Sequence, residues 1–375
     1  MPTILHVAQS SEGGVATFVA DLAGAQRAAG HRVAVACVPD SRLAHAAARA
    51  GADVIAWQAV GAPGRTVPAE VAAVTRIVRT VRPDLVHLHS SKAGLAGRLA
   101  LRGHLPTVFQ PHAWSFFATG PGPLYRATVR WERLAARWAH QVVCVSEAER
   151  ADGEAAGVRA RCTVVPNGVD LDHYRAAPVA ERRAARARLG LDARTPLAVC
   201  IGRLHRQKGQ DVLLEAWPGI ARTVPDARLA LVGDGPARDR LRQRATADVL
   251  FAGDVADPRD WYLAADLVVL PSRWEGMALA PLEAMACACP VVVSDVPGAR
   301  EALPAGHAAT NLVPPEDPAA LAGAVAALLS DREACRTLGG QARTHVCARH
   351  GFGRVVDDIR GVYREAHRVW RTAAR

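Results

Sequence analysis

The sequence predicts an α/β protein with two doubly wound, Rossmann-like domains. Short runs of β-branched and apolar residues alternate with Ala-, Leu- and Arg-rich stretches along most of the chain, which is typical of parallel α/β units. These runs are almost continuously apolar, as expected for strands buried on both faces of a sheet. A chain of 375 residues is also too long for one compact core and suits two domains.

The expected strands form two series, separated by a polar, basic linker at 167–192 that contains no strand. We therefore expect domains at 1–168, completed by a C-terminal helix at 355–375, and at 169–354. Such domains would face each other across a cleft at the carboxyl ends of their strands, where these sheets usually bind ligands. The strands are expected at 4–8, 33–38, 54–57, 85–89, 107–110, 142–145 and 163–165, then at 197–201, 229–232, 249–252, 267–270 and 291–294.

Composition narrows the classes of partner and location. The net charge of +10 favours anionic partners such as phosphates, and Lys92 and Lys208 are the only lysines among 46 basic residues. No run of about 18 apolar residues predicts a membrane span. The start "MPTILHVAQS" lacks a signal-peptide pattern, so a cytoplasmic location is expected. No cysteine or histidine group has zinc-like spacing, so no metal site is expected.

Two motifs follow strands of the first series. Gly13-Gly14 opens a helix, and glycine allows backbone N–H groups to approach an anion there. This is not the dinucleotide fingerprint, and an ordinary turn is an equal alternative. His112 follows Pro111 in "PHAW", where it is expected to face the cleft unless it is a core histidine.

A basic motif, "IGRLHRQKGQ", follows the first strand of the second series. Arg203 and Lys208 precede a helix expected to begin near Gly209. Two cations beside helix-terminal N–H groups can clamp a diphosphate, Arg as a planar fork and Lys as a compact charge. The alternative is a pair of solvated loop charges.

The stretch "WEGMALAPLEAM" places Glu275 and Glu283 around a helix start. Pro281 is expected at N1, so that Ala280 is an N-cap without a capping oxygen and Glu283 falls at N3. The first N–H groups would then be open to an outside anion. A nucleotide-sugar would place its diphosphate there, with one carboxylate towards each flanking sugar. Taken singly, Glu283 is explained by the helix dipole and Glu275 by exposure on a loop.

Together these stretches resemble the retaining glycosyltransferases of family 4, which have the GT-B fold. The resemblance covers nearly the whole chain in the family's order. It is less complete at Gly276-Met277-Ala278, where the family often has Gly-Phe-Gly, and at Pro297-Gly298, where it often has Gly-Gly. The matching stretches are the Gly13-Gly14 loop, "LVHLHSSKAG", "PHAW", "VVCVSEAE", "VVPNGVD", "GRLHRQKG", "LVGDGP", "LVVLPSRWEGMALAPLEAMACACPVVVSD" and "NLVPPEDPAALA".

The resemblance implies a role for each matched residue. Arg203 and Lys208 would hold the donor diphosphate, which Gly14 would approach from the other domain. Glu283 would bind the ribose hydroxyls and Glu275 the donor sugar. The other implied contacts are His112, facing the transferring sugar; Gly13, Gly253, Asp254, Val255, Gly276, Met277, Ala278, Leu279 and Ala280 around the donor; and Ser91, Lys92 and Trp114 on the acceptor side.

The implied activity is transfer of a sugar from a nucleotide diphosphate sugar, with UDP favoured and GDP as the alternative, to an acceptor hydroxyl with retention. The acceptor would be a glycan, a lipid-linked saccharide or a small molecule. No cofactor is expected, because two cations and a helix N-terminus can neutralise the leaving diphosphate without a metal. An inverting or epimerase-like enzyme acting on UDP-N-acetylhexosamine is the alternative within the fold.

Two other classes fit less well. A nicotinamide-dependent dehydrogenase would need a dinucleotide fingerprint and an acidic residue after the second strand, and the sequence has neither. A nucleic-acid-binding protein would gather its basic residues on one face with aromatic side chains. Here arginines occur on nearly every expected helix, so no nucleic-acid partner is expected.

The segment 123–140 predicts a helix that suits an anionic membrane surface. Trp131 and Trp138 lie seven residues apart and are expected to share a face with Leu134 and Ala135. Arginines at 126, 130, 133 and 137 would contact lipid headgroups, giving peripheral contact at the inner membrane face. The alternative is that the apolar stripe packs on the sheet while the arginines face water.

Overall fold

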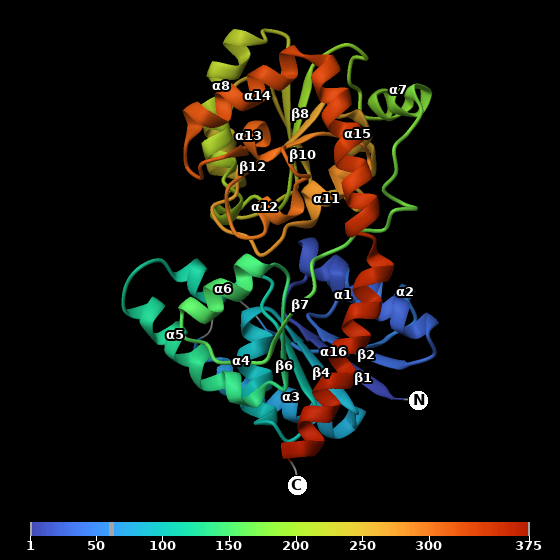
Figure 1. Cartoon of the computed structure of the whole chain (residues 1–375), viewed down its shortest axis with the longest axis vertical. Helices are drawn as coiled ribbons and strands as arrows, with labels where there is room; N and C mark the ends of the chain where they lie inside the picture. Colours follow the sequence, from blue (N-terminus) through green and yellow to red (C-terminus); the bar gives the residue numbers. More distant parts are fainter. Residues whose placement is uncertain (1, 60–63, 374–375) are drawn as a thin grey trace. The chain divides into compact units, whose positions relative to one another are not determined.

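The computed structural model describes residues 2–59 and 64–373, and their contacts divide the chain into two compact units. Unit 1 comprises Met1–Pro166 and Gly353–Arg375, and unit 2 comprises Asn167–Phe352. The expected divisions, after 168 and after 354, lie two residues from these. Each unit contains a parallel sheet between helices, so the predicted fold class is confirmed (Figure 1).

The sheet of unit 1 has the strand order β3-β2-β1-β4-β5-β6-β7. Each strand begins and ends within one residue of its expected position, because apolar β-branched runs mark buried strands clearly. The strands are β1 (Thr3–Ala8), β2 (Arg32–Cys37), β3 (Asp53–Ala56), β4 (Leu85–His89), β5 (Thr107–Gln110), β6 (Gln141–Cys144) and β7 (Cys162–Val164). The helices are α1 (Gly13–Ala28), α2 (Arg42–Arg49), α3 (Val67–Val81), α4 (Ser90–Leu101), α5 (Pro123–Ala135), α6 (Glu147–Ala155) and α16 (Phe352–Ala373), with 3₁₀ turns at Ser115–Thr119 and Ala136–Trp138.

The two faces of this sheet differ in polarity. On one face, apolar side chains of β1 and β4 pack with residues of α3 and α4. On the other face, His6, His87 and His89 occupy the alternate strand positions. Gln26 of α1 and Tyr363 of α16 contact these histidines, so α16 supplies part of the interior of unit 1 (Figure 1).

The sheet of unit 2 has the strand order β10-β9-β8-β11-β12-β13. The two-residue strand β13 was not expected from the sequence. The strands are β8 (Leu197–Ile201), β9 (Arg228–Val232), β10 (Val249–Gly253), β11 (Leu267–Leu270), β12 (Val291–Ser294) and β13 (Leu312–Val313). The helices are α7 (Val179–Arg188), α8 (Gln210–Thr223), α9 (Arg238–Arg244), α10 (Arg259–Ala264), α11 (Leu279–Ala286), α12 (Ala299–Ala302), α13 (Ala308–Asn311), α14 (Pro318–Ser330) and α15 (Arg332–Arg349), with a 3₁₀ turn, η3, at Arg206–Lys208.

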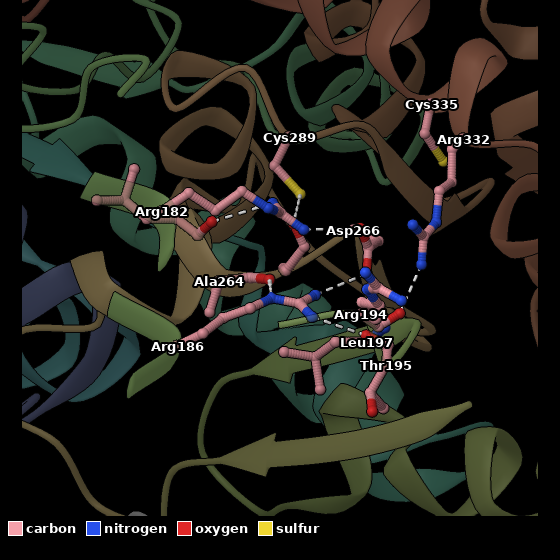
Figure 2. Close-up of polar contacts among 12 residues, drawn as sticks. Arg182, Arg186, Arg194, Thr195, Leu197, Ala264, Asp266, Cys289, Arg332 and Cys335 are labelled. Carbon is pink, nitrogen blue, oxygen red and sulfur yellow. Dashed lines mark hydrogen bonds and ion pairs between the residues drawn. The ribbon is translucent and has the colours of Figure 1, made fainter. Parts of the chain in front are cut away.

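Asp266, directly before β11, fastens α7 to the sheet of unit 2 (Figure 2). Its carboxylate accepts hydrogen bonds from Arg182 Nη2 at 2.7 Å, Arg186 Nη2 at 2.8 Å and the backbone N–H of Leu197 at 2.9 Å. Both arginines also donate to backbone carbonyls at the end of α10, including that of Ala264 at 2.9 Å. Asp266 thus offsets one of these two positive charges, and the neutral carbonyls accept the remaining hydrogen bonds.

Helix α5 differs in part from its expected orientation. Val129 and Ala135 are buried, and the rings of Trp131 and Trp138 lie half-buried with their centroids 6.1 Å apart. Leu134 is 42% exposed, so it does not take part in the packed face as Ala135 does. The packed stripe follows positions 129, 132 and 135 instead. Within 2–59 and 64–373, no helix is long and apolar enough to cross a membrane.

Candidate active site

The sheet orders place the predicted site residues where the winding of each sheet reverses. In unit 2, β8 lies between β9 and β11, and in unit 1, β1 lies between β2 and β4. Ligands of doubly wound sheets usually bind at the carboxyl ends of strands at such a point. Arg203 follows β8, Glu275 follows β11, and Gly13 follows β1 after a short loop.

In unit 2, the loop after β8 and the loop after β11 are joined by four contacts. The backbone N–H of Arg273 donates to the carbonyl of Gln207 at 2.8 Å, and Gln207 Nε2 donates to the carbonyl of Trp274 at 3.0 Å. Arg273 Nη1 donates to the carbonyl of Arg206 at 2.8 Å. The fourth contact is an ion pair between Lys208 and Glu275. The basic motif and the acidic motif therefore form one cluster, which the sequence alone did not show.

Glycine is required where these two loops meet. Gly209 has a φ of 66°, and a Cβ at this position would lie 1.9 Å from the carbonyl oxygen of Pro271. Its conformation ends η3 and begins α8, as the sequence predicted. Arg273 holds the same junction through Asp211, with hydrogen bonds of 2.8 and 3.0 Å from its two terminal nitrogens. The cations of the loop are thus presented on a rigid backbone.

Lys208 and Glu275 form a partly buried ion pair. Lys208 Nζ lies 2.5 Å from Glu275 Oε1, which also accepts a hydrogen bond from the hydroxyl of Ser272 at 2.8 Å. The side chain of Lys208 keeps 20% of its exposure and that of Glu275 keeps 9%. Because a fifth of the Lys208 side chain is exposed, an anionic ligand could replace or share this partner without opening the core.

Arg203 gives the same loop a charge that no neighbour neutralises. Its side chain is exposed, and no carboxylate in the described ranges 2–59 and 64–373 pairs with it. Burial lowers the pKa of His205, and the positive charges of Arg203, Arg206 and Lys208 lower it further. A positive potential of this kind attracts an anion such as a diphosphate.

The start of α11 differs from the expectation. The helix begins at Leu279 with Ala278 as N-cap, so the expected N-cap Ala280 and the N1 position of Pro281 are wrong by two residues, and Glu283 is the fifth helical residue. Proline fits here as well, because every N–H of the first turn lacks an intrahelical partner. As expected, no side chain caps the helix.

Glu283 is buried and held by a tyrosine. It is 7% exposed and accepts a hydrogen bond of 2.5 Å from the hydroxyl of Tyr262, a fully buried residue of α10. Burial and the neighbouring carboxylate raise the pKa of Tyr262, so the phenol remains a donor. The buried carboxylate of Glu283 is therefore held in place by a neighbouring helix.

The loop between the two glutamates has a fixed backbone. The carbonyl of Met277 accepts a hydrogen bond of 2.7 Å from Asn167 Nδ2, and Met277 itself is buried. Gly298, with a φ of 74°, packs so closely that a Cβ would lie 1.8 Å from the carbonyl oxygen of Gly276. The second glycine of the family's pair is therefore required by packing, while Pro297 replaces the first.

The remaining donor-side residues lie at strand or helix ends. Gly253 ends the edge strand β10 with a φ of 75°, and its carbonyl accepts from the N–H of Gly233 at 2.7 Å. Asp254 and Val255 follow it, the first exposed and the second half-buried. In unit 1, Gly13 and Gly14 are exposed in the first turn of α1, whose N-cap side chain makes no capping hydrogen bond.

His112 lies in a strained turn directly after β5. His112 has a φ of 56° and Ala113 a φ of 110°, values that L-residues rarely adopt. Glu149 of α6 holds this turn: its Oε1 accepts from the N–H of Ala113 and its Oε2 from the N–H of Val145, both at 2.6 Å. Burial raises the pKa of Glu149 to about 7. The carboxyl group thus has no access to solvent and is kept for these two backbone donors.

A row of buried histidines leads from α1 to His112. His6, His87 and His89 are fully buried, and they are the one group of three possible metal ligands within 4.8 Å of one another in the described part of the chain. Both ring nitrogens of His6 and of His89 already have hydrogen-bond partners. The row is therefore a hydrogen-bonded network, and the metal-independent reaction stays a prediction.

Of the three residues expected on the acceptor side, two are buried in the core. Lys92 was expected to contact the acceptor. Its side chain is 1% exposed and pairs at 2.7 Å with Glu70, which is 3% exposed, so this contact is not possible. Trp114 is also buried, with its indole N–H on the carbonyl of Glu149 at 2.7 Å, and it belongs to the core. Ser91 is half-buried in the first turn of α4. Lys92 and Trp114 each follow an apolar strand, and a side chain in such a segment can point either into the core or towards the ligand. The sequence therefore did not predict that both are buried.

Sequence reasoning missed Glu149, His6 and His89. A signal existed for each of them. His87 and His89 alternate on one strand, which places both on one face of the sheet, and Glu149 follows a strand in "VVCVSEAE" at a position where Ser146 caps α6. Buried polar side chains are usually hydrogen-bonded. Polar residues within or after apolar strands could therefore have been predicted to bind one another or a nearby backbone N–H group.

Comparison with known proteins agrees with this architecture. The glycosyltransferase family 4 model matches residues 12–173, and the glycosyl transferases group 1 model matches residues 195–331. The chain is 33% identical over 316 residues to a D-inositol 3-phosphate glycosyltransferase of Thermobispora bispora, covering 78% of this chain and 73% of that protein. It is 35% identical over 195 residues to the lipopolysaccharide core biosynthesis mannosyltransferase LpsB of Rhizobium meliloti, covering 48% and 55% respectively.

A solved structure is similar over almost the whole chain. The crystal structure of Anabaena Alr3699/HepE in complex with UDP-glucose matches with a TM-score of 0.82 and 26% identity, covering 96% of this chain and 99% of that one. Fold, motifs and relatives thus agree in both units, and the chain belongs to the family 4, group 1 glycosyltransferases with the GT-B fold.

Proposed function

We propose that this enzyme transfers a sugar from a UDP-sugar to an acceptor hydroxyl with retention of configuration and without a metal ion. The observation that carries the proposal is the charge of the loop after β8. Arg203 is exposed without a carboxylate partner in the described ranges, and Lys208 retains access to solvent. The Anabaena neighbour, which binds UDP-glucose, supports the choice of base.

In the proposed complex, Arg203 and Lys208 hold the donor diphosphate, and Glu283 accepts from the ribose hydroxyls. The departing diphosphate carries growing negative charge, so preorganised cations stabilise the transition state more than the bound donor. Lys208 would exchange part of its contact with Glu275 for the phosphate. Glu275 is then available to the hydroxyls of the donor sugar beside the reacting carbon.

Retention is proposed to proceed by attack of the acceptor on the face that the diphosphate leaves. His112 faces the transferring sugar in this proposal. The described part of unit 1 offers no obvious carboxylate nucleophile beside His112, because Glu149 is buried on two backbone N–H groups. The acceptor hydroxyl would belong to a glycan, a lipid-linked saccharide or a small molecule.

A panel of nucleotide-sugars tests the donor and the stereochemistry. UDP should raise the unfolding temperature more than GDP or ADP, and a UDP-hexose should be hydrolysed slowly without acceptor. The coupling constant of the anomeric proton in the product, measured by NMR, should match that of the donor. Inverted product would contradict retention, and stabilisation by GDP alone would contradict the choice of base.

Arg203→Ala provides the matched test of the clamp. UDP affinity should fall by about tenfold or more, since a hydrogen bond to a charged group contributes about 1.5–3 kcal/mol. Arg222→Ala is the control, because Arg222 is an exposed arginine in the last turn of α8, at the other end of the helix that Gly209 begins. Equal losses in the two variants would show a general effect of net charge.

Peripheral contact of α5 with an anionic membrane is a further part of the proposal. Leu124 and Leu134 are 63% and 42% exposed, and Arg126 and Arg130 are exposed beside them. The leucines thus replace the tryptophans as the apolar contacts. Arg133 is excluded from the test because its Nε donates to the carbonyl of Ala156.

Co-sedimentation with vesicles tests the membrane contact. Binding should rise with the fraction of anionic lipid, fall with salt and be lost in a double variant, Arg126→Gln with Arg130→Gln. The control is Arg76→Gln with Arg79→Gln, which removes the same charge from the exposed side of α3. Binding to anionic vesicles no stronger than to neutral ones would exclude the contact.

A further inference from the structure

A continuous row of hydrogen bonds runs from α1 to the ring of His112. Gln26 Oε1 lies 2.8 Å from His6 Nε2, His6 Nδ1 lies 3.0 Å from His89 Nε2, and His89 Nδ1 lies 3.1 Å from His112 Nε2. Successive rings are nearly parallel, at 24° and 28°. The row uses both nitrogens of His6 and His89 but only Nε2 of His112.

The protons in this row are coupled. Burial lowers the pKa of His6 to about 4, that of His112 to about 3 and that of His89 well below its usual range, so all three rings are neutral at neutral pH. A neutral imidazole has one N–H donor and one acceptor nitrogen. Each contact needs one of each, so either every ring has its proton on Nε2 or every ring has it on Nδ1.

The amide of Gln26 decides between these two arrangements. Its Nε2 donates to the hydroxyl of Tyr363 at 3.2 Å, which turns its Oε1 towards His6. Burial raises the pKa of Tyr363, so the phenol keeps its proton, and its hydroxyl also lies 2.9 Å from His87 Nδ1. A carbonyl oxygen can only accept, so His6 must have its proton on Nε2, and the rest of the row follows.

We propose that Gln26, acting through His6 and His89, holds His112 as the tautomer with its proton on Nε2 and a bare Nδ1 that faces the transferred sugar. This inference rests on the proposed function, in which His112 lies beside that sugar. The lone pair on Nδ1 is the negative end of the imidazole dipole. It stabilises the positive charge that develops on the anomeric carbon, whereas an N–H at the same place would oppose it.

Gln26, His6 and His89 are therefore positioning residues. Neither fully buried His6 nor fully buried His89 can touch a substrate, and Gln26 is 5% exposed. They fix the tautomer of His112, whereas an isolated imidazole would exchange between both tautomers. A row of neutral groups achieves this without placing a charge in the core, which would carry a large desolvation cost.

Histidine tautomers can be measured directly. The full chain labelled with ¹⁵N-histidine would be studied by long-range ¹H–¹⁵N correlation between pH 6 and 8, with His112→Asn used to assign the ring signals of His112. We expect a protonated Nε2 and an unprotonated Nδ1 for His112 across this range. A proton on Nδ1 of His112 in the wild-type protein would overturn the inference.

Two matched glutamine variants test whether Gln26 sets the tautomer of His112. In Gln26→Leu, the acceptor at the start of the row is lost, so the two nitrogen shifts of His112 should move towards each other as both tautomers become populated. Gln141→Leu is the control, because Gln141 is a buried glutamine on β6 that pairs with Thr163 and lies outside the row. Unchanged His112 shifts in Gln26→Leu, or equal changes in both variants, would overturn the inference.

Kinetics separate positioning from folding. Gln26→Leu should lower kcat by about tenfold, the lower end of the effect seen when outer partners of metal-binding histidines are removed, while UDP affinity stays unchanged. Gln26→Glu keeps an acceptor for His6 and should restore the tautomer. If Gln26→Leu does not fold, Tyr363→Phe removes the hydroxyl that orients the amide and should mix the tautomers in the same way.

The two proposals fail differently. If the wild-type protein transfers no sugar from any donor, the proposed function is wrong, and the tautomer spectra alone decide whether the row is set by Gln26. If transfer occurs but the spectra show a proton on Nδ1 of His112, only the inference about the row is wrong.

Discussion

The two lysines of the chain form the same contact in two different settings. Lys92 pairs with Glu70 at 2.7 Å in unit 1, and Lys208 pairs with Glu275 at 2.5 Å in unit 2. The side chains of the first pair are 1% and 3% exposed, whereas those of Lys208 and Glu275 are 20% and 9% exposed. Each lysine follows a strand of a parallel sheet, so sequence position does not distinguish them.

The difference in exposure decides what each pair can do. A fully enclosed pair must stay intact, because either charge left alone in the core is strongly unfavourable. A pair that solvent reaches can exchange one partner for a ligand of the same charge. The contrast therefore supports the proposal that the Lys92 pair stabilises the fold and the Lys208 pair binds the ligand, and the same substitution at both lysines tests it.

The largest expected effect is on stability, in Lys92→Met. Removing the ammonium leaves the Glu70 carboxylate buried without a partner, which should lower the free energy of unfolding by about 3–5 kcal/mol. Denaturant unfolding measures this change. UDP affinity of the folded fraction should stay as in the wild type, and a loss of UDP affinity without a loss of stability would reverse the assignment of the two lysines.

Lys208→Met should instead act on catalysis. Turnover should fall by about a hundredfold, since removal of one group that stabilises transition-state charge costs about 2.7–4 kcal/mol. Stability should change less than in Lys92→Met, because Glu275 retains the hydroxyl of Ser272 and some contact with solvent. Steady-state kinetics and unfolding curves of both variants complete the comparison. Wild-type turnover in folded Lys208→Met would exclude the clamp.

Glu149→Gln should lower turnover by about tenfold by loosening the His112 turn. An amide has one acceptor oxygen, so one of the N–H groups of Ala113 and Val145 loses its partner. Glu147→Gln is the control, because Glu147 is an exposed neighbour on the same helix. Equal turnover of the wild type and Glu149→Gln would show that the turn does not need the clamp.

The same carboxyl group predicts a pH dependence. Below its pKa of about 7, protonation removes one acceptor, so wild-type turnover should rise as pH increases through about 7, and this step should be absent in Glu149→Gln. The folded-state pKa lies above the ordinary value of 4.5, so the folded chain binds the proton more tightly. The contribution of this group to the free energy of unfolding therefore decreases as pH rises from about 4.5 to about 7.

The two glutamates of the acidic motif should show smaller effects of different kinds. Glu283→Gln should weaken UDP binding, because it contacts the ribose in the proposed complex. Glu275→Gln should lower kcat with UDP affinity nearly intact, because it meets only the sugar. Calorimetry with UDP and steady-state kinetics separate the two, and equal losses of UDP affinity would contradict the assignment.

No effect at all is expected from removal of divalent metals. Turnover should be unchanged in excess EDTA, since the proposed clamp uses protein cations in place of Mg²⁺. A strict need for added Mg²⁺ or Mn²⁺ would contradict the metal-free proposal.

Local sequence patterns predicted the strands and the motifs well. They did not predict contacts between residues that are distant in the sequence. The strands were placed within one residue in unit 1 because their apolar runs are continuous, whereas the two residues of β13 are too few to form such a pattern. The N-cap of α11 was misplaced because proline fits throughout the first turn. The burial of Lys92 depends on Glu70, which lies on another helix, and no local pattern predicts that pairing.

The return of α16 to unit 1 has a consequence for synthesis of the chain. Tyr363 lies 276 residues after His87, its hydrogen-bond partner, and all of unit 2 is translated between them. Domains generally begin to fold from the N-terminus during translation. While unit 2 is being synthesised, unit 1 therefore lacks the hydroxyl that orients Gln26. The interior of the first unit is completed only by the last segment to emerge, so the nascent chain cannot set the tautomer of His112 until unit 2 has also been made.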